Sequence, residues 1–486
     1  MNFRGRVVAI LMGLSLVMGA GVTYLFANVG TEELPIYAME EQTAPSTSGT
    51  STNNEAEIDK ISRAMQVISE SYVEKVDEEK LVEGAIQGML ETLDDPYSVY
   101  MNKETAKQFT DSLDSSFEGI GAEVSMIDGK VTIVSPYKGS PAEKAGLKPN
   151  DQIITVDGNS LEGLDLYEAV LKIRGKKGSI VKLEVQRPGV AKPLIVDVTR
   201  DEIPIETVYS SVKDVNGEKI GYIEVTSFSE DTAQHFEEGV AELEKQNITG
   251  LVIDVRGNPG GYLQSVEQML KQFITKEKPY LQIENREGEK KRFFSSLKEK
   301  KDYPISVLID GGSASASEIL AGAMKEAGGY DIVGVKSFGK GTVQQAMPME
   351  DGSNLKLTLF KWLTPEGNWI HEKGVEPTVI VEQPEYFHAS PIEVEEPLKL
   401  DQTSEQIKNA QIMLRGLGFE PGRTDGYFGA ETDVAVKAFQ RTNELSVTGE
   451  IDEQTAGKMQ QQIIELIRSE ENDIQLEVAL KLVQQK

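Results

Sequence analysis

Hydrophobic residues recur at two spacings along this chain, and the two spacings divide it into helical and strand-rich regions. Between residues 58 and 90, apolar side chains return every three or four positions, which is the period of one helix face. The pattern pauses near Val76 and Asp77 and stops at Pro96, so it predicts two amphipathic helices. Residues 43–55 (TAPSTSGTSTNNE) have almost no apolar side chains, and we expect them to form a flexible tether.

Short β-type runs replace the helical pattern after residue 119. AEVSMI, VTIVSP, QIITVDG and IVKLEVQR surround one helical stretch at 164–173, which predicts a small, partly open β-barrel. Farther along, GYIEVTSF, GLVIDVRG, ISVLID and DIVGVKSF alternate with helical stretches that begin near Thr232, Leu263 and Ser315. This alternation predicts an α/β domain with a buried sheet.

The last part of the chain is helical again, and the chain of 486 residues is long enough for several domains. We predict a multidomain α+β protein in which residues 460–486 form one charged amphipathic helix that packs or pairs. The predicted boundaries are 1–28 for a signal or transmembrane anchor, 29–56 for a linker, 57–112 for an N-terminal helical segment, 113–200 for the barrel, 201–390 for the α/β core, 391–403 for a second, acidic linker, 404–460 for a compact third unit and 461–486 for the C-terminal helix.

The N-terminus has the layout of an export segment. Arg4 and Arg6 precede an uncharged run at 7–28, which acidic residues follow from Glu32 onward. The run is closer to the ~20 residues of a membrane span than to the ~7–15 of a cleaved signal, so we expect an uncleaved single-pass anchor. Flanking arginines favour a cytoplasmic N-terminus, which places the other domains outside the cell membrane. The alternative is a cleaved signal and a secreted protein.

Composition removes several classes of chemistry. A formal net charge of −29 repels phosphate groups, so no nucleic-acid partner is expected. The chain has no cysteine, which excludes disulfides, thiol nucleophiles and thiolate metal sites. Its three histidines lie far apart without the HExxH spacing of a zinc helix, and we predict neither a metal nor a cofactor. A nucleophile must therefore be an oxygen or an amine.

The segment ISVLIDGGSASASEILAGAM offers a serine nucleophile. It runs from an apolar strand through a Gly-Gly turn into helix-forming residues, so the turn exposes a serine at a helix N-terminus. Unpaired N–H groups and the helix dipole favour developing negative charge at such a place. The alternative is that Ser313, Ser315 or Ser317 only caps the helix.

The segment SFGKGTVQQ offers a base for that serine. Lys340 stands between two glycines, and a buried lysine can accept the hydroxyl proton because desolvation lowers its pKa. Gln344, four residues later, can orient the amine without adding a negative charge. Residues four apart in a strand are separated by about 13 Å, so contact between these two requires a turn or helical register near Thr342. The alternative is an exposed lysine flanked by glycines.

Three segments, LVIDVRGNPGGYL, DGGSASASEILAGAM and GVKSFGKGTVQQ, resemble the signature blocks of carboxyl-terminal processing proteases, the tail-specific proteases of family S41. The likeness spans about residues 58–382. It implies that Ser315 is the nucleophile, Lys340 the base and Gln344 the residue that orients it. The fold it implies is an α/β core related to the crotonase and Clp proteins.

The same resemblance implies an oxyanion hole. One donor is the backbone N–H of Ala316, directly after the nucleophile. The other comes from the glycine pair of NPGG, Gly260 and Gly261, and the sequence leaves open which of the two donates.

FEGIGAEVSM and SPAEKAGLKPNDQIITVDG resemble the carboxylate-binding loop and the second half of PDZ domains. The N–H groups of such a loop cradle a terminal carboxylate while the bound tail adds a strand and packs against the helix at 164–173. Here the loop residues are Gly119, Ile120, Gly121 and Ala122. The alternative is that these glycines only serve a β-turn.

Arg174, which follows the predicted helix in KIRGKKGS, is a candidate for coupling tail binding to the protease core. Its guanidinium precedes a glycine hinge and can reach polar groups of the core in one arrangement of the module. The alternative is an exposed basic helix end that complements the helix dipole.

Residues 404–459 resemble a small three-helix peptidoglycan-binding domain, on the cues DGYFG, AFQ and TGEID. The resemblance implies attachment to the cell wall. Alternatively, Asp425 and the glycines only shape turns and cap helices, and the unit is structural or binds another partner.

These observations predict an extracytoplasmic serine endopeptidase with a Ser–Lys dyad that selects proteins by their C-terminal tails. A non-catalytic PDZ and cell-wall-binding scaffold is the alternative, and a peptidoglycan hydrolase is a weaker one because no paired carboxylates stand out. Helices at 58–93 and 460–486 could pair two subunits as a homodimer.

Overall fold

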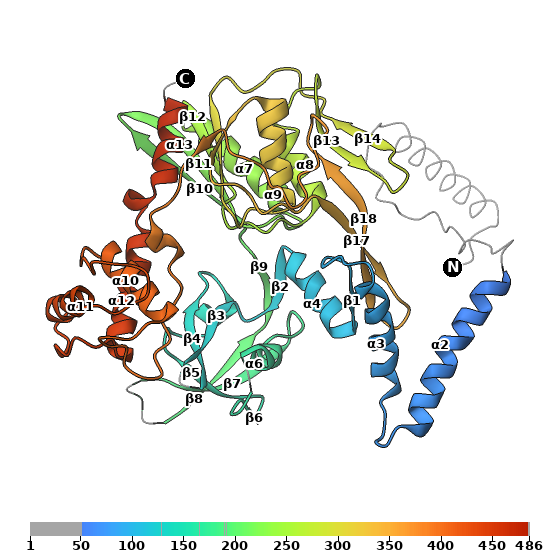
Figure 1. The fold of residues 1–486 in the computed structure, drawn as a ribbon, viewed down its shortest axis with the longest axis horizontal. Coiled ribbons are helices and arrows are strands. Elements are labelled where there is room, and N and C mark those ends of the chain that lie inside the picture. Colours follow the sequence, from blue (N-terminus) through green and yellow to red (C-terminus); the bar gives the residue numbers. More distant parts are fainter. Residues whose placement is uncertain (1–50, 128, 165, 189, 191, 485–486) are drawn as a thin grey trace, which may run out of the picture. The chain divides into compact units, whose positions relative to one another are not determined.

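The computed structural model describes the chain from residue 51 onward, without residues 1–50, 128, 165, 189, 191 and 485–486 (Figure 1). Its described residues fall into two compact units, which divide between Ala85 and Ile86. The predicted anchor at 1–28 lies outside the described residues. Within the residues that are described, no helix has the length and apolar character needed to span a membrane.

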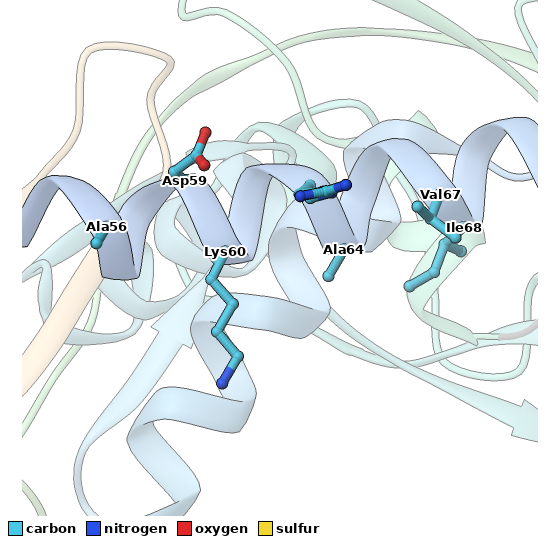
Figure 2. Close-up of a pocket in the computed structure, with 7 residues that line it drawn as sticks. Ala56, Asp59, Lys60, Ala64, Val67 and Ile68 are labelled. Carbon is cyan, nitrogen blue, oxygen red and sulfur yellow. The ribbon is translucent and has the colours of Figure 1, made fainter.

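The predicted N-terminal helices are present as α2 (Ser51–Ser71) and α3 (Glu78–Glu91). The prediction that the tether extends to residue 55 is wrong, because α2 already begins at Ser51. Ser, Thr and Asn favour helix N-termini, so a lack of apolar residues did not exclude a helix here. A hollow of about 560 Å³ has its described lining on α2 alone. Figure 2 shows three of the residues that line it, Lys60, Ala64 and Ile68, which follow one another at intervals of one helical turn.

The second domain is an antiparallel sheet in the order β3-β4-β5-β7-β8, with β6 paired to β5. All the β-type runs predicted here are strands, and the predicted helix is α6. Its core is apolar and closed to solvent around Ile133, Leu183 and Val185. The elements are β3 (Ala122–Ile127), β4 (Lys130–Pro136), α5 (Pro141–Lys144), β5 (Gln152–Val156), β6 (Asn159–Ser160), α6 (Leu166–Ile173), β7 (Ile180–Gln186) and β8 (Leu194–Thr199).

A two-stranded ribbon joins the entry and exit of this domain. β2 (Ser116–Gly119) pairs antiparallel with β9 (Asp201–Pro204), so Gly119 lies opposite Asp201. The ribbon continues into the α/β region on one side and into the helical segment, which ends with α4 (Lys103–Leu113), on the other. The domain is therefore inserted through one narrow stem.

The predicted buried sheet is confirmed, and it has six strands in the order β10-β11-β12-β15-β16-β19. β11 to β19 run parallel, while β10 is antiparallel to β11. Every residue of β12 and β15 is buried, as expected for strands covered on both faces. The elements are β10 (Val208–Val215), β11 (Glu218–Val225), α7 (Thr232–Lys245), β12 (Gly250–Asp254), α8 (Leu263–Leu270), β15 (Ile305–Ile309), α9 (Ala316–Ala323), η1 (Met324–Gly328), β16 (Asp331–Gly334) and β19 (Val379–Ile380).

A second, antiparallel sheet was not predicted. Its strands are β1 (Val99–Met101), β13 (Pro279–Glu284), β14 (Lys290–Phe294), β17 (Thr342–Pro348) and β18 (Asn354–Leu363). Gln344 lies in β17, so the predicted turn or helical register near Thr342 is wrong. The strand is instead irregular at this place, because its pairing with β18 shifts register between Val343 and Gln344.

The predicted third unit consists of α10 (Glu405–Gly416), α11 (Ala430–Thr442) and α12 (Glu453–Arg468), preceded by the short η2 (Glu385–His388). Residues 460–486 do not form one helix, which corrects the prediction. α12 ends at Arg468, and after η3 (Glu470–Asn472) a separate helix, α13 (Ile474–Gln484), begins. Ser469 is extended and Asp473 accepts a hydrogen bond from the N–H of Leu476, so the chain stops one helix and caps the next.

Helix α13 completes the six-stranded sheet. Leu476, Ala479 and Val483 pack with Ile220, Val252 and Leu308 from three neighbouring strands. Residues that alternate with these on β11 face α7 instead, since a Cβ on Gly221 would lie 3.2 Å from Leu243. The sheet is thus covered on one face by α7 and on the other by a helix from the far end of the chain.

We expect Leu476→Ala to lower the free energy of unfolding by about 2–5 kcal/mol, because it removes a buried side chain from this layer. Ile474→Ala, on the same helix but 41% exposed, should change it by less than about 0.5 kcal/mol. Urea unfolding monitored by tryptophan fluorescence measures both. Trp362 lies in β18 of the second sheet, and Trp369 lies shortly after that strand, so both report the unfolding of the core. Equal effects of the two variants would contradict the packing of α13.

Candidate active site

Ser315 stands at the N-cap of α9 in a backbone conformation that serine rarely adopts. Its φ is 54° and its ψ is −111°. Positive φ values of this kind cost a non-glycine residue free energy, and they cluster at functional sites. The turn that the sequence predicted therefore presents Ser315 at a helix N-terminus under local strain.

The three serines of SASAS differ in what their hydroxyls do. Ser313 and Ser317 are fully buried, and their Oγ atoms donate to the carbonyls of Val255 at 2.7 Å and Asn258 at 2.8 Å. Ser315 is partly exposed and forms a capping box with Glu318, in which the Glu318 carboxylate accepts from the N–H of Ser315 and the Ser315 side chain faces the N–H of Glu318. Among the described residues, only the hydroxyls of Ser313 and Ser317 donate structural hydrogen bonds in this turn, and the hydroxyl proton of Ser315 is left available.

Asn258 ties the NPGG loop to this turn. It is fully buried, and its carbonyl accepts hydrogen bonds from the N–H of Ala314 at 3.0 Å and from the hydroxyl of Ser317. Its side chain donates to the carbonyl of Val225 at 2.7 Å and accepts from the N–H of Gly260 at 2.8 Å. The loop and the nucleophile turn are consequently held as one piece.

The two glycines of NPGG have different roles. Gly260 has a φ of 106°, and a Cβ on it would lie 2.9 Å from the Cβ of Ser315 and 3.1 Å from the nitrogen of Ala316, so only glycine allows this approach. The N–H of Gly260 is already used by Asn258. Within the described part of the chain, the N–H groups of Gly261 and Ala316 donate to no other group. These two amides are the available oxyanion donors.

Lys340 is half-buried, and its ammonium lies over the ring of Tyr97, 4.8 Å from the centroid. Burial lowers the pKa of Lys340, and the nearby charge of Lys356 lowers it further, while Asp95 and Glu318 raise it. The net effect is a pKa below the ordinary value for lysine. Such a shift favours the neutral amine that a general base requires.

A buried carboxylate, Glu318, connects the serine turn to the lysine loop. It is closed to solvent and accepts hydrogen bonds from the N–H of Ser315 at 2.8 Å and the N–H of Lys340 at 2.8 Å. It also accepts from Gly339 N–H and Ser337 Oγ, both at 2.6 Å. Sequence reasoning missed this residue, although a glutamate three positions after an N-cap serine is a recognised capping pattern.

The side chains of Ser315, Lys340 and Gln344 are not joined by hydrogen bonds among the described residues; Lys340 and Gln344 have other partners. Gln344 donates to the hydroxyls of Thr342 at 2.9 Å and Thr358 at 3.1 Å. No hydrogen bond among the described residues joins Gln344 to Lys340, or Lys340 to Ser315. The structure thus brings the backbones of Ser315 and Lys340 together through Glu318, without a hydrogen bond between their functional atoms among the described residues.

An aromatic cleft of about 480 Å³ lies beside the lysine loop. Its lining includes Tyr97, Trp369 and His371, together with Thr342 and Thr358 from the strands near Gln344. Trp369 and His371 stack with ring centroids 5.1 Å apart, and Tyr97 meets His371 edge-on at 6.2 Å. No local pattern predicted this cleft, because its residues come from segments far apart in the chain.

In the second domain, the predicted carboxylate loop has two unpaired amides. Among the described residues, the N–H groups of Ile120 and Gly121 donate no hydrogen bond, while their carbonyls accept from Ala142 at 2.7 Å and Tyr137 at 2.9 Å. The other two predicted residues, Gly119 and Ala122, lie in strands β2 and β3. Gly121 has a φ of 72°, and a Cβ on it would lie 2.6 Å from Ser140. Two adjacent free amides are what a terminal carboxylate needs.

Arg174 lies at the base of the same loop. Its guanidinium is 4.5 Å from the centroid of the Phe117 ring, and a Cβ on Gly119 would lie 3.7 Å from its Cγ. Arg174 thus contacts the stem strand that leads into the carboxylate loop, a position between the second domain and the rest of the chain.

In the third unit, the residues that carried the resemblance build turns. Gln440 is fully buried and accepts hydrogen bonds from the N–H groups of Thr448 and Gly449, both at 3.0 Å. Asp425 forms an ion pair with Arg423, which lowers the pKa of Asp425 to about 2. These contacts give Gln440, Gly449 and Asp425 a structural role in the turns of this unit.

Comparisons with known proteins agree with this architecture. Residues 219–381 match Peptidase family S41, 119–198 match the PDZ domain, 403–459 match the putative peptidoglycan binding domain, and 16–105 match the activating protease CtpB N-terminal domain. The carboxy-terminal processing protease CtpB of Bacillus subtilis is 58% identical over 476 residues, covering 98% of both chains. CtpA of the same organism is 43% identical over 90% of this chain and 92% of its own.

A probable CtpA-like serine protease of Staphylococcus aureus is 37% identical over 86% of this chain and 84% of its own. Among solved structures, the photosystem II D1 C-terminal processing protease is 27% identical, with a TM-score of 0.41 over 66% of this chain and 92% of that one. The near full-length identity to CtpB and CtpA does not favour a non-catalytic scaffold. The chain therefore belongs to the carboxy-terminal processing proteases, serine-type peptidases of family S41.

Proposed function

We propose that this chain cleaves proteins selected by their C-terminal tails, with Ser315 as nucleophile and Lys340 as base. The observation that carries the proposal is the hydroxyl of Ser315 at the start of α9, which donates to no other described group. Through Glu318, the Ser315 turn is tied to the loop that contains Lys340. A serine peptidase needs a nucleophile, a base and donors for the oxyanion, and this one region of the core supplies all three.

In the proposed reaction, Ser315 Oγ attacks the scissile carbonyl carbon as its proton passes to neutral Lys340. The N–H groups of Ala316 and Gly261 hold the oxyanion, and each such donor typically contributes about 2.7–4 kcal/mol. Lys340 then gives its proton to the leaving amine, which breaks the C–N bond and leaves an ester on Ser315. Water hydrolyses the ester, and Lys340 again accepts and returns the proton.

Lys340 must leave the ring of Tyr97 to reach Ser315. The contact with the ring depends on the positive charge of the ammonium, so it weakens when the amine becomes neutral. The side-chain amide nitrogen of Gln344 donates to the hydroxyls of Thr342 and Thr358. Its amide oxygen would accept a hydrogen bond from the amine of Lys340 once that amine has moved. Loss of the proton from Lys340 therefore also favours the movement of its amine from Tyr97 toward Ser315.

For substrate selection, the PDZ domain binds a terminal carboxylate at Ile120 and Gly121, and the tail extends along α6. Arg174 couples that event to the core through the stem at Phe117. We place these domains outside the cell membrane, anchored by residues 1–28, with the third unit on peptidoglycan and two chains paired through α2 and α3. The apolar and exposed Ile58 and Val67 of α2, with Tyr72 directly after it, support the pairing.

Replacing Ser315 by alanine should abolish peptide cleavage, with kcat falling about a thousandfold or more, while the fold is retained. Ser317→Ala is the matched control, because it removes a buried structural hydrogen bond and no reacting atom. It should lower the midpoint of thermal unfolding and still cleave far faster than Ser315→Ala. Steady-state kinetics and circular dichroism measure both, and normal turnover by folded Ser315→Ala would remove the assignment.

The pH dependence of kcat/KM should report Lys340. Because the base must be neutral, the rate should rise with pH through the pKa of Lys340, which burial holds below its ordinary value. Lys356→Gln removes a charge that lowers this pKa, so the acid limb should move to higher pH. Asp95→Asn removes a charge that raises it, and the limb should move to lower pH. Shifts in the same direction would exclude Lys340 as the titrating base.

Tail recognition should depend on a free terminal carboxylate. A peptide substrate with an amidated C-terminus should show a KM about tenfold or more higher than the same peptide with a free carboxylate, because two amides lose a charged acceptor. The binding of both peptides to Ser315→Ala, followed by fluorescence anisotropy, separates recognition from cleavage. Equal affinities would mean that the loop at Ile120 serves only as a turn.

A further inference from the structure

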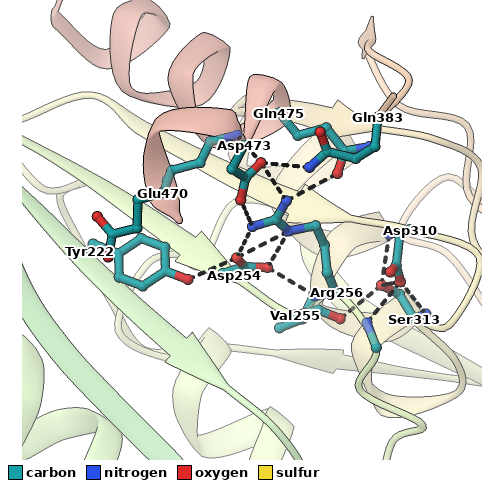
Figure 3. A network of polar contacts seen from close by, with 12 residues as sticks. Tyr222, Asp254, Val255, Arg256, Asp310, Ser313, Gln383, Glu470, Asp473 and Gln475 are labelled. Atoms are coloured by element: carbon teal, nitrogen blue, oxygen red, sulfur yellow. Dashed lines mark hydrogen bonds and ion pairs between the residues drawn. The ribbon is translucent and has the colours of Figure 1, made fainter. Parts of the chain in front are cut away.

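One arginine next to the oxyanion loop binds the far end of the chain. Arg256 is the second residue after β12 and precedes the loop 257–261. Its guanidinium donates to Asp254 Oδ2 at 2.6 Å, to Asp473 Oδ1 and Oδ2 at 2.9 and 2.7 Å, and to Gln475 Oε1 at 3.1 Å (Figure 3). A residue 217 positions away in sequence thus completes the surroundings of this arginine.

The chain leaves the core and returns to it at the same point. Gln383, just after β19, donates to Asp473 at 2.6 Å, and Gln475 donates to the carbonyl of Val381 at 2.8 Å. The segment between them, 384–472, contains the residues that match the peptidoglycan-binding domain. That domain is therefore an insertion in the protease core, and its two connections meet beside Arg256.

The contacts of Arg256 are largely closed to solvent. The exposed fraction is 17% for its side chain, 4% for Asp254 and 15% for Asp473. Burial alone would lower the pKa of Arg256, but the two carboxylates raise it, so the guanidinium stays charged. A buried charge of this kind holds its partners firmly, because an unpaired ion in the interior is strongly unfavourable.

The residues that follow Arg256 in the chain connect it to the turn that contains Ser315. Gly257 N–H donates to Asp310 Oδ1 at 2.8 Å, and the same carboxylate accepts from Ser313 N–H in the nucleophile turn. Three residues farther, Gly260 lies against Ser315, and Gly261 follows with its free N–H. The loop is short, so the anchoring of Arg256 fixes one end of the segment that carries the proposed oxyanion donor.

We propose that Asp473 is a positioning residue for the protease: by holding Arg256, it fixes the loop that presents Gly261. The inserted third domain is thereby connected to turnover, because both of its ends converge on this contact. The inference rests on the proposed use of Gly261 as an oxyanion donor. It concerns kcat rather than substrate binding, since Asp473 contacts neither the aromatic cleft nor the PDZ loop.

Asp473→Asn tests this, because asparagine keeps the shape and can still cap α13 but loses the charge. Glu470→Gln is the matched control: it removes a second ion pair between the same segment and the core, to Lys213 at 2.6 Å, without touching Arg256. With a short peptide substrate we expect Asp473→Asn to lower kcat about tenfold or more with KM nearly unchanged. Glu470→Gln should retain kcat within about twofold.

Equal losses in both variants would mean a general loosening of the segment and would overturn the proposal, as would an unchanged kcat in Asp473→Asn. Gln475→Met provides a milder variant in case Asp473→Asn does not fold, since it removes two neutral hydrogen bonds, to Arg256 and to the carbonyl of Val381, and leaves both ion pairs of Arg256. It should lower kcat about two- to threefold, with KM unchanged. A normal kcat in that variant would also count against the proposal.

Amide hydrogen exchange in the Ser315→Ala background gives a readout that needs no activity. The N–H groups of Gly257 and Gly260 are hydrogen-bonded, so their exchange reports the order of the loop. Exchange should accelerate in Asp473→Asn and not in Glu470→Gln, and unchanged protection in Asp473→Asn would refute the link. If wild type showed no Ser315-dependent cleavage, the proposed function would fail while the exchange result would still decide this contact.

Discussion

The active site depends on one buried carboxylate. Glu318 is closed to solvent, and an ionised group there is tolerated only when hydrogen bonds replace its lost water. Four donors satisfy this need, and they come from the serine turn and the lysine loop, which lie more than twenty residues apart. Because no donor can move away without leaving the charge unsatisfied, Ser315 and Lys340, the proposed nucleophile and base, share one rigid frame.

In this part of the core the backbone is held by hydrogen bonds, whereas the side chains of Lys340 and Gln344 can change partners. The NPGG loop, the Ser315 turn and the Lys340 loop are joined by backbone hydrogen bonds through Asn258, Asp310 and Glu318. The amine of Lys340, by contrast, lies on an aromatic ring, and Gln344 is held by hydroxyls. Small movements of side chains, with little cost in backbone energy, therefore separate the arrangement seen here from a closed dyad. The stem at Phe117 and the contact at Arg256 connect this frame to the two inserted domains.

Much of the fold followed from local pattern. The apolar runs that became β12 and β15 are buried on both faces, and their uniform hydrophobicity was a direct sign of this. The second sheet gave no such sign, because strands such as β14 (KKRFF) mix charged and apolar residues and lie partly exposed. The break between α12 and α13 was missed because both helices are amphipathic, so one periodic pattern ran across two separate packing surfaces.

The sequence by itself determined the chemistry that is present: a serine at a strand–turn–helix junction, a glycine-flanked lysine, a glycine-rich loop and the absence of thiols. Only the tertiary structure decided which of three serines has a free hydroxyl, which of two glycines has a free N–H, and that Tyr97 and Glu318 surround Lys340. It also decided that the last helix belongs to the protease core. The reason is physical: residue types and spacing are local, whereas hydrogen-bond satisfaction and burial depend on groups that only folding brings together.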